Sequence, residues 1–187
     1  MKAVQIQVLL NVLDEVTQRY DEMFELKERL LQEAKYKSTH DLLTSLYNRS
    51  YFEMKVRELI KKHEPFCMVF LDLDNFKHVN DTYGHKSGDE VLIEVADILT
   101  KNLKGRDIIG RFGGDEFVIA LRSNKQNSVK IMQSIIDKIG NVFKIYNITA
   151  SVGIAEYPET TDYKELLKKA DEMMYKAKKS GKNKIAY

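Results

Sequence analysis

Residues 111–117 have the sequence Arg-Phe-Gly-Gly-Asp-Glu-Phe and lie between two short runs of residues that favour β-strands. This pattern predicts a tight hairpin turn, because Gly113 and Gly114 can adopt the positive φ angles that such turns require. Asp115 and Glu116 follow at the tip of the turn. Adjacent carboxylates repel each other unless a cation compensates them. The turn is therefore either a solvated acidic loop or part of a site for a divalent cation that arrives with a phosphate.

A second pair of carboxylates follows an apolar segment upstream. Residues 66–71 form a continuous apolar run of strand length, which predicts a central strand buried on both faces. The run continues into Asp72-Leu73-Asp74. Side chains alternate between the two faces of a strand, so Asp72 and Asp74 point the same way while Leu73 points into the core. Near the hairpin carboxylates, this strand end predicts an oxygen-rich site for a hard cation.

The remaining segments predict an α+β fold. Their patterns predict, in chain order, a helix over 50–62, the strand at 66–71, a helix over 88–103, the hairpin, a helix over 128–141, a strand over 145–157, a helix capped by Asp162 and an edge strand within 183–187. The embedded β-α-β-β-α-β order is ferredoxin-like. We therefore expect a mainly antiparallel sheet with helices on one face.

A long polar segment separates the strand at 66–71 from the next helix. It is too rich in functional side chains to be a plain linker, and these include Asn75, Lys77, Asn80, Asp81, His85 and Asp89. Ser87 and Glu90 predict a capping box that opens the helix near Gly88. The amide groups at that helix start are a further candidate for holding a ligand.

The first 37 residues differ in character from the rest, because they contain no Gly or Pro. Apolar residues recur there at a spacing of three and four, interrupted by Lys27, and they are Ile6, Leu9, Leu13, Val16, Tyr20, Met23, Leu30 and Ala34. This heptad seam predicts a long coiled-coil helix that pairs with a second copy, the alternative being a helix folded back on its own domain. We expect a dimerisation or signalling helix over 1–37 and a globular domain over 38–187.

Composition excludes several classes of protein. The formal net charge of +2 predicts neither bulk nucleic-acid binding nor adsorption to membranes. The single Cys67 lies within an apolar run, which suits a buried thiol in a reducing compartment. No signal peptide is recognisable, and no apolar stretch approaches the roughly 20 residues of a membrane span. The sequence therefore predicts a cytoplasmic protein.

Several short motifs follow one another in a definite order from about residue 38 to the C-terminus. They comprise 41–49 (Asp-Leu-Leu-Thr-Ser-Leu-Tyr-Asn-Arg), 72–77 (Asp-Leu-Asp-Asn-Phe-Lys), Asn80-Asp81, Gly84-His85, Gly88-Asp89, 111–117, 151–155 (Ser-Val-Gly-Ile-Ala), Ala170-Asp171, Tyr175, Ala177-Lys178 and Gly181-Lys182-Asn183. Together they resemble the motifs of GGDEF domains, the diguanylate cyclases of bacteria. The resemblance implies a ferredoxin-like sheet related to nucleotidyl cyclases and polymerase palms, in agreement with the element order.

The resemblance also implies a reaction, in which two GTP molecules condense to cyclic di-GMP and two pyrophosphates. The enzyme would work as a homodimer with one GTP per subunit and with Mg²⁺ or Mn²⁺. Asp72, Asp115 and the backbone carbonyl of Leu73 match the family's metal ligands, and Asp115 also matches the acceptor of the 3′-hydroxyl proton. Glu116 is either a second ligand or a support. The alternative is a catalytically weak module that acts as a receptor for guanine nucleotide or cyclic di-GMP, and a purely structural dimerisation module is a third possibility.

Substrate recognition is implied by further matches to the family. Asn80 and Asp89 match guanine-binding positions, since an amide and a carboxylate can pair with the donor and acceptor edge of guanine. Burial of Asp89 would then penalise adenine. His85 either helps to position the nucleotide or is a packing or capping residue. The phosphate-binding cations would be Lys77, Lys178 and Lys182, the last at a position where Arg is usual.

Regulation departs from the family pattern. Many members carry an Arg-x-x-Asp inhibitory site for product just upstream of the hairpin, and here Lys104 and Asp107 occupy the corresponding positions. Lysine cannot stack on guanine and form a bidentate contact as arginine does, so we expect product inhibition to be weakened or lost. Nothing before residue 38 is predicted to bind a signal. A sensory domain or partner is therefore expected outside this chain.

Overall fold

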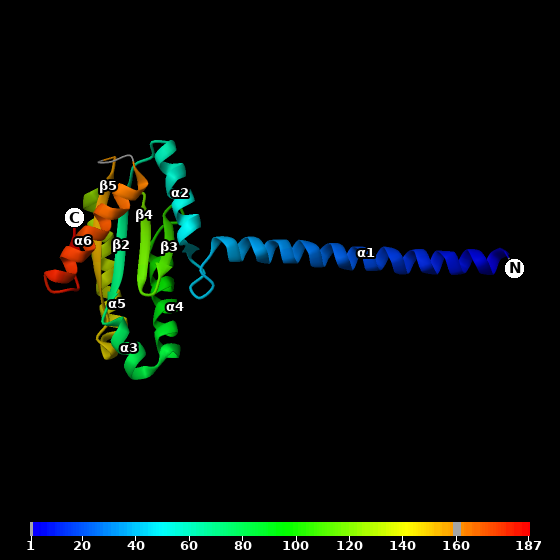
Figure 1. Cartoon of the computed structure of the whole chain (residues 1–187), viewed down its shortest axis with the longest axis horizontal. Helices are drawn as coiled ribbons and strands as arrows, with labels where there is room; N and C mark the ends of the chain where they lie inside the picture. The colour runs from blue at the N-terminus through cyan, green and yellow to red at the C-terminus, as the bar shows by residue number, and fades with distance from the viewer. Residues whose placement is uncertain (1, 159–161) are drawn as a thin grey trace. The chain divides into compact units, whose positions relative to one another are not determined.

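The computed structural model describes residues 2–158 and 162–187, except for the side chains of residues 2–7, 9 and 12. The chain divides into two compact units, one that ends at Ser38 and one that spans Thr39–Tyr187. Figure 1 shows the course of the chain from the N-terminal helix to the C-terminal strand. The two units are described separately below.

The first unit is helix α1 (Lys2–Thr39), which is uninterrupted. The predicted long helix is thus confirmed, and the absence of Gly and Pro explains its continuity. Its described large apolar seam residues are more than half exposed, and these are Leu13, Val16, Tyr20, Met23 and Leu30. Ala34 is exposed as well. The side chains of Ile6 and Leu9, also assigned to the seam, lie outside the described residues.

The second unit is built on a sheet of six described strands in the order β1-β3-β4-β2-β5-β6. The strands are β1 (Tyr47–Asn48), β2 (Phe66–Asp74), β3 (Ile108–Gly113), β4 (Glu116–Leu121), β5 (Thr149–Tyr157) and β6 (Ile185–Ala186). The four central strands pair antiparallel, while β1 and β6 join the edges in parallel. The ferredoxin-like prediction and the predicted C-terminal edge strand are confirmed. All nine residues of β2 are buried, as the apolar run predicted.

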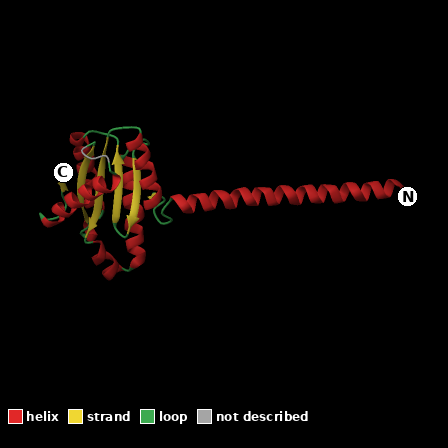
Figure 2. Cartoon of the chain, turned by 45° about the horizontal axis from the view of Figure 1, so that its top comes forward, coloured by secondary structure: helices red, strands yellow, loops and turns green. Residues whose placement is uncertain are grey.

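Helices cover both faces of this sheet (Figures 1 and 2). They are α2 (Arg49–Lys61), α3 (Phe76–Tyr83), α4 (His85–Asn102), α5 (Lys125–Val142) and α6 (Tyr163–Lys179), with a short 3₁₀ turn at Lys144–Tyr146. The apolar faces of α4 and α5 pack with one side of β2, whereas those of α2 and α6 pack with the other. The prediction of helices on one face is therefore wrong. Alternate residues of β2 are apolar on both sides, and such a strand needs a cover on each face.

The polar segment after β2 is mostly helical, which the sequence analysis did not predict. Helix α3 occupies its first part, and Gly84, with φ of +85°, separates it from α4. The predicted capping box is wrong, because α4 begins at His85 and the Ser87 hydroxyl donates to the carbonyl oxygen of Tyr83 instead. A positive φ at Gly84 lets one helix follow another without a side-chain cap.

Other boundaries differ by a few residues. Helix α5 begins at Lys125 because the side chain of Asn124 accepts a hydrogen bond from the backbone of Asn127 and caps it. Strand β5 begins at Thr149, later than predicted, because a 3₁₀ turn occupies the segment before it. The predicted Asp162 cap of α6 is confirmed by the hydrogen bond from the Glu165 backbone, 3.0 Å long.

Candidate active site

The turn between β3 and β4 is the predicted hairpin. Gly113 and Gly114 have φ angles of +141° and +51°, which a side chain would disfavour, and Gly113 pairs with Glu116 across the turn. Arg111 stabilises the turn, because its Nε and Nη2 atoms donate to the carbonyl oxygen of Gly114 at 3.1 and 2.7 Å. The turn is thus fixed by backbone conformation and by a charged donor.

The C-terminal end of β2 meets this turn. Asp72 lies opposite Glu116 in the β2–β4 register, and the Leu73 amide donates to the Asp115 carbonyl oxygen at 3.2 Å. Asp72 is only 6% exposed. Two segments that are about forty residues apart in the sequence therefore bring Asp72, Asp115 and Glu116 to the same end of the sheet.

The carboxylates at this end influence one another. Burial raises the pKa of Asp72 to about 6, with Lys178 opposing the shift and Asp115 adding to it. Burial also raises the pKa of Glu116, and the charges of Asp115 and Asp171 add to the effect. Acids held together out of water in this way resist ionisation unless a cation joins them.

Lys178 of α6 reaches Asp72 from the side. Its Nζ atom lies 2.6 Å from Asp72 Oδ1, so the two side chains form an ion pair. Helix α6 comes this close because Gly153 of β5 has no side chain, and a Cβ atom there would lie 2.0 Å from the carbonyl oxygen of Ala170.

Asp74 shares a face with Asp72 but has a different environment. Its carboxylate accepts hydrogen bonds from the hydroxyls of Thr149 and Ser151, both 2.8 Å long, and from the Asn183 amide at 3.1 Å. Asp74 therefore ties β2 to β5 and to the segment after α6. It has a structural role here, whereas the Asp72 carboxylate is ion-paired with Lys178.

The donor set suits a divalent metal ion of the hard type. The Asp72 carboxylate is buried, and Asp115 and Glu116 lie at the adjoining turn. No group of three or more His, Cys, Asp or Glu side chains within residues 2–158 and 162–187 has the arrangement of a complete metal site. Mg²⁺ is usually held by one or two carboxylates together with substrate phosphates, so these residues fit such an ion.

The predicted guanine-binding residues lie on two successive helices. Asn80 is on α3, and its Oδ1 atom is so close to Gly88 that a Cβ there would lie 2.0 Å away. Asp89 follows Gly88 on α4 and is exposed, contrary to the burial that we expected. The first turns of α4 thus bring Asp89 near Asn80. His85, the first residue of α4, is exposed and is therefore not a packing residue, while its role in positioning the nucleotide stays a prediction.

The predicted phosphate-binding cations lie around the end of β2. Lys77 is exposed on α3, and Lys178 contacts Asp72 as described. Lys182 Nζ donates to Asn75 Oδ1 at 2.9 Å, and the Asn75 side chain donates in turn to the Asn147 carbonyl oxygen at 2.9 Å. Sequence reasoning missed this role of Asn75, although its position after the two aspartates was visible.

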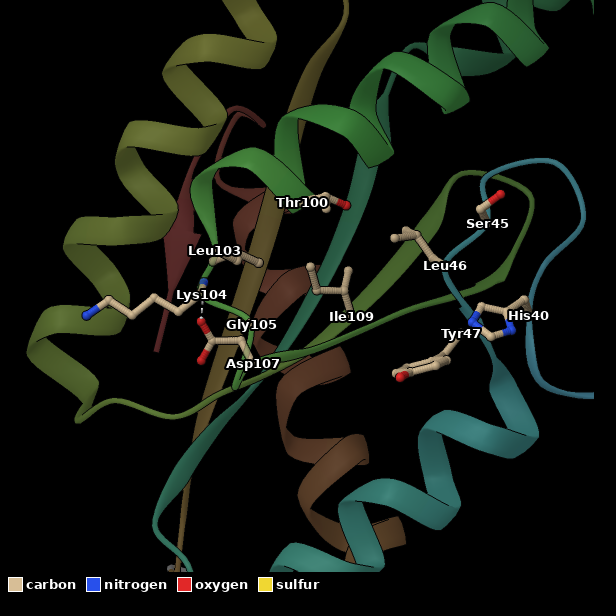
Figure 3. Close-up of a pocket in the computed structure, with 10 residues that line it drawn as sticks. All are labelled: His40, Ser45, Leu46, Tyr47, Thr100, Leu103, Lys104, Gly105, Asp107 and Ile109. Atoms are coloured by element: carbon tan, nitrogen blue, oxygen red, sulfur yellow. Dashed lines mark hydrogen bonds between the residues drawn. The ribbon is translucent and has the colours of Figure 1, made fainter. Parts of the chain in front are cut away.

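The predicted inhibitory pair lies beside a cavity of about 280 Å³ (Figure 3). The Asp107 carboxylate accepts hydrogen bonds from the backbone amides of Lys104 and Arg122, at 2.8 and 2.9 Å. The Lys104 side chain is exposed and extends away from that carboxylate. Asp107 thus stabilises the turn before β3, and the two side chains do not form a joint site in this arrangement.

The fold and the acidic turn define a domain of the nucleotidyl-cyclase type. A family described as "Diguanylate cyclase, GGDEF domain" matches residues 38–184. The chain belongs to this GGDEF family.

Individual relatives agree with this membership. The chain is 40% identical over 149 residues to YtrP, an uncharacterised protein of Bacillus subtilis, covering 78% of this chain and 25% of the relative. It is 35% identical over 158 residues to the diguanylate cyclase DgcS of Shewanella oneidensis, covering 81% of this chain and 53% of the relative. The chain therefore spans about half or less of the length of these curated relatives.

A solved structure resembles nearly the whole chain. It is the coiled coil and GGDEF domain of DgcB from Caulobacter crescentus in complex with cyclic di-GMP, with a TM-score of 0.80 and 26% identity. The likeness covers 92% of this chain and 96% of that one, so it includes much of α1. Among the described helices, none has the length and apolar character that a membrane span requires.

Proposed function

We propose that this chain is a diguanylate cyclase, which condenses two GTP molecules into cyclic di-GMP and two pyrophosphates. The observation that carries the proposal is the meeting of Asp72 with the hairpin acids, where burial and mutual repulsion raise the pKa values of Asp72 and Glu116. Such an arrangement costs stability and is expected where a cation and a phosphate are bound. A solvated acidic loop would leave the carboxylates unperturbed.

The acidic residues would activate the attacking hydroxyl group, by accepting its proton and by holding a metal ion. The 3′-hydroxyl of one GTP attacks the α-phosphorus of the other, and pyrophosphate leaves. Asp115 accepts the proton of that hydroxyl, while Asp72, Asp115 and the Leu73 carbonyl oxygen would hold Mg²⁺ or Mn²⁺, with Glu116 as a further ligand or a support. The ion, when bound, neutralises charge on the triphosphate and favours ionisation of the hydroxyl.

The lysines would serve the phosphates. Lys178 already lies against Asp72, and Lys182 is held near the end of β2 through Asn75. Both positions suit cations that stabilise the negative charge of the leaving pyrophosphate. Lys77 on the exposed side of α3 would add a third cation.

The residues of α3 and α4 would select guanine. Asn80 can donate to and accept from the base, and Asp89 can accept from N1–H and N2–H₂. Because Asp89 is exposed, an unmatched adenine would leave its carboxylate hydrated rather than stranded. The resulting preference for GTP is therefore smaller than burial would give.

The symmetry of the product requires two such sites. Each subunit would contribute one GTP, and the exposed apolar seam of α1 would pair two copies as a coiled coil. Tethering two domains in this way raises their effective concentration to roughly the millimolar range. A regulatory partner or sensory segment outside this chain would then control the pairing.

One experiment separates this function from a receptor role. Purified protein is incubated with GTP and either Mg²⁺ or Mn²⁺, and the nucleotides are separated by anion exchange. We expect cyclic di-GMP and pyrophosphate in a ratio of one to two. Binding of GTP or cyclic di-GMP without turnover under either metal would overturn the cyclase proposal and favour a receptor.

A further inference from the structure

A second cavity lies on the face of the sheet that α2 and α6 cover. Its volume is about 400 Å³, which is within the range of small-molecule sites. We call it the α2–α6 cavity, and its lining residues of interest are Arg49, Phe112, Glu116, Tyr163, Lys164 and Leu167. It contains neither Asn80 nor Asp89, the predicted guanine-binding residues on α3 and α4.

The lining of this cavity includes several aromatic rings. Phe70 and Phe112 pack edge to face, with ring centroids 6.1 Å apart and an angle of 83° between the rings. The guanidinium of Arg49 lies 5.1 Å from the centroid of Phe112. Flat apolar rings with a cation beside them favour a flat aromatic ligand over an aliphatic one.

Tyr163 supplies an unused hydrogen-bonding group. It lines the cavity and is only 2% exposed, yet its hydroxyl has no hydrogen-bond partner among the described residues. The oxygen atom of this hydroxyl is enclosed by the protein in this structure. A buried hydroxyl without a partner costs free energy, which a ligand acceptor would recover once the ring turns toward the cavity. Burial raises the pKa of Tyr163 to about 12, so the group remains a donor over the physiological range.

Charged groups of both signs border the cavity. Glu53 is engaged by Arg57, with contacts of 2.7 and 2.9 Å, and Lys168 lies 3.7 Å from Glu172. Among the other lining residues, Arg49 and Lys164 provide donors, while Glu116 and Asp171 provide acceptors. A ligand that fits must therefore offer both acceptors and donors around a planar ring.

We propose that the α2–α6 cavity is a second nucleotide site, which binds a purine base. A purine presents a broad π face to the aromatic residues, ring and carbonyl acceptors to Tyr163 and Arg49, and N–H donors to the acidic residues. A phenyl ring lacks the donors and acceptors. The proposal concerns binding alone and does not depend on turnover at the hairpin.

A ligand in the cavity would influence the hairpin turn through one residue that both share. Glu116 lines the cavity and also lies opposite Asp72 at the start of β4. A base that accepts or donates at Glu116 would change the charge available to a metal ion at the hairpin. The site therefore offers a route by which a purine nucleotide regulates the neighbouring centre.

The test measures binding of GMP and AMP by equilibrium dialysis in EDTA, so that no metal-dependent turnover interferes. A double variant, Asn80→Ala with Asp89→Ala, provides the background, because it removes both predicted base contacts on α3 and α4. In that background we expect about one GMP or AMP per chain. Tyr163→Phe should weaken this binding roughly fivefold to tenfold, because it removes one hydrogen-bond donor. Leu167→Trp, which fills the cavity, should abolish it.

Tyr157→Phe is the matched control. Tyr157 belongs to the same apolar cluster but does not line the cavity, so its variant should bind as the parent does. Ribose 5-phosphate should not compete. Absence of bound purine nucleotide in the double-variant background, binding that survives both Tyr163→Phe and Leu167→Trp, or displacement by ribose 5-phosphate would each overturn the proposal. Tyr163→Phe retains the ring, so the test stands even if Leu167→Trp does not fold.

Discussion

Arg111 and Asp41 form an ion pair across 70 residues of sequence, with Nη1 and Oδ1 3.0 Å apart. Asp41 also accepts hydrogen bonds from the backbone amide and hydroxyl of Thr44. Arg111 simultaneously donates to the Gly114 carbonyl oxygen. The segment that enters the domain is therefore joined to the β3–β4 turn through one guanidinium.

Replacing Arg111 should loosen both connections. We expect Arg111→Ala to lower the free energy of unfolding by about 2 kcal/mol, because it removes charge-assisted hydrogen bonds from a side chain that is 11% exposed. Urea denaturation followed by circular dichroism measures the change. Arg106→Ala, an exposed arginine in the preceding turn, is the control and should be neutral. Equal midpoints for the two variants would contradict the assigned role.

Asp72 should make stability depend on pH in EDTA. Its pKa is raised from 3.8 to about 6 in the folded chain, so between these values the folded state holds a proton that the unfolded state has lost. Stability therefore falls as pH rises from about 4 to 6. Asp72→Asn should abolish this slope and raise the free energy of unfolding at pH 7 by up to about 3 kcal/mol. A parallel pH profile in the variant would argue against the shift.

Asp115→Asn should abolish cyclase turnover while the fold remains intact. The amide keeps the shape of the side chain but neither accepts the hydroxyl proton nor carries the charge that a metal ion requires. The assay follows cyclic di-GMP formation, with thermal unfolding as the check on folding. Asp137→Asn, an exposed acid on α5, should retain full activity. Normal turnover by Asp115→Asn would remove it from the catalytic site.

Asp89→Ala should relax the preference for GTP over ATP. One hydrogen bond to an exposed carboxylate contributes about 1 kcal/mol, which corresponds to roughly a fivefold change in the ratio of kcat/KM values. Competition kinetics with both nucleotides measures this ratio. Glu90→Ala, its exposed neighbour on α4, is the control. If discrimination is the same in both variants, the base is selected elsewhere.

The apolar seam of α1 should control activity through association. Charged substitutions at two of its exposed positions, Leu13→Glu and Val16→Glu, should lower activity per chain sharply while GTP binding survives. Activity of the parent should rise with protein concentration. Gln18→Glu, outside the seam, should have little effect. Sedimentation supplies the independent measure, and a monomeric variant with full activity per chain would show that the helix does not drive pairing.

The sequence was sufficient to predict the centre of the domain. The apolar run before Asp72 and the two glycines before Asp115 are local signals, and each determines a strand end or a turn within a few residues. The order of the predicted helices and strands also led to the correct ferredoxin-like sheet. These features depend on residues that are close together in the chain.

What the sequence could not supply were contacts between distant segments. The ion pair of Lys178 with Asp72 and the hydrogen bonds of Asp74 to β5 join residues that are far apart, and no spacing indicates such partners. The two-sided helical cover was missed for a related reason. Amphipathic helices show that one face is buried, but not which side of the sheet they bury it against.

Because α6 packs closely against β5 at Gly153, a change at this contact would tilt the helix. Ala170 and Met174 lie against this glycine, and Lys178 lies one turn beyond Met174, about 6 Å further along the helix axis. A side chain at position 153 would push the helix away at its point of contact and tilt its far end, where the ammonium group lies. A single methyl group in the middle of the sheet would thus change the position of Lys178, the proposed phosphate-binding cation, without touching the nucleotide.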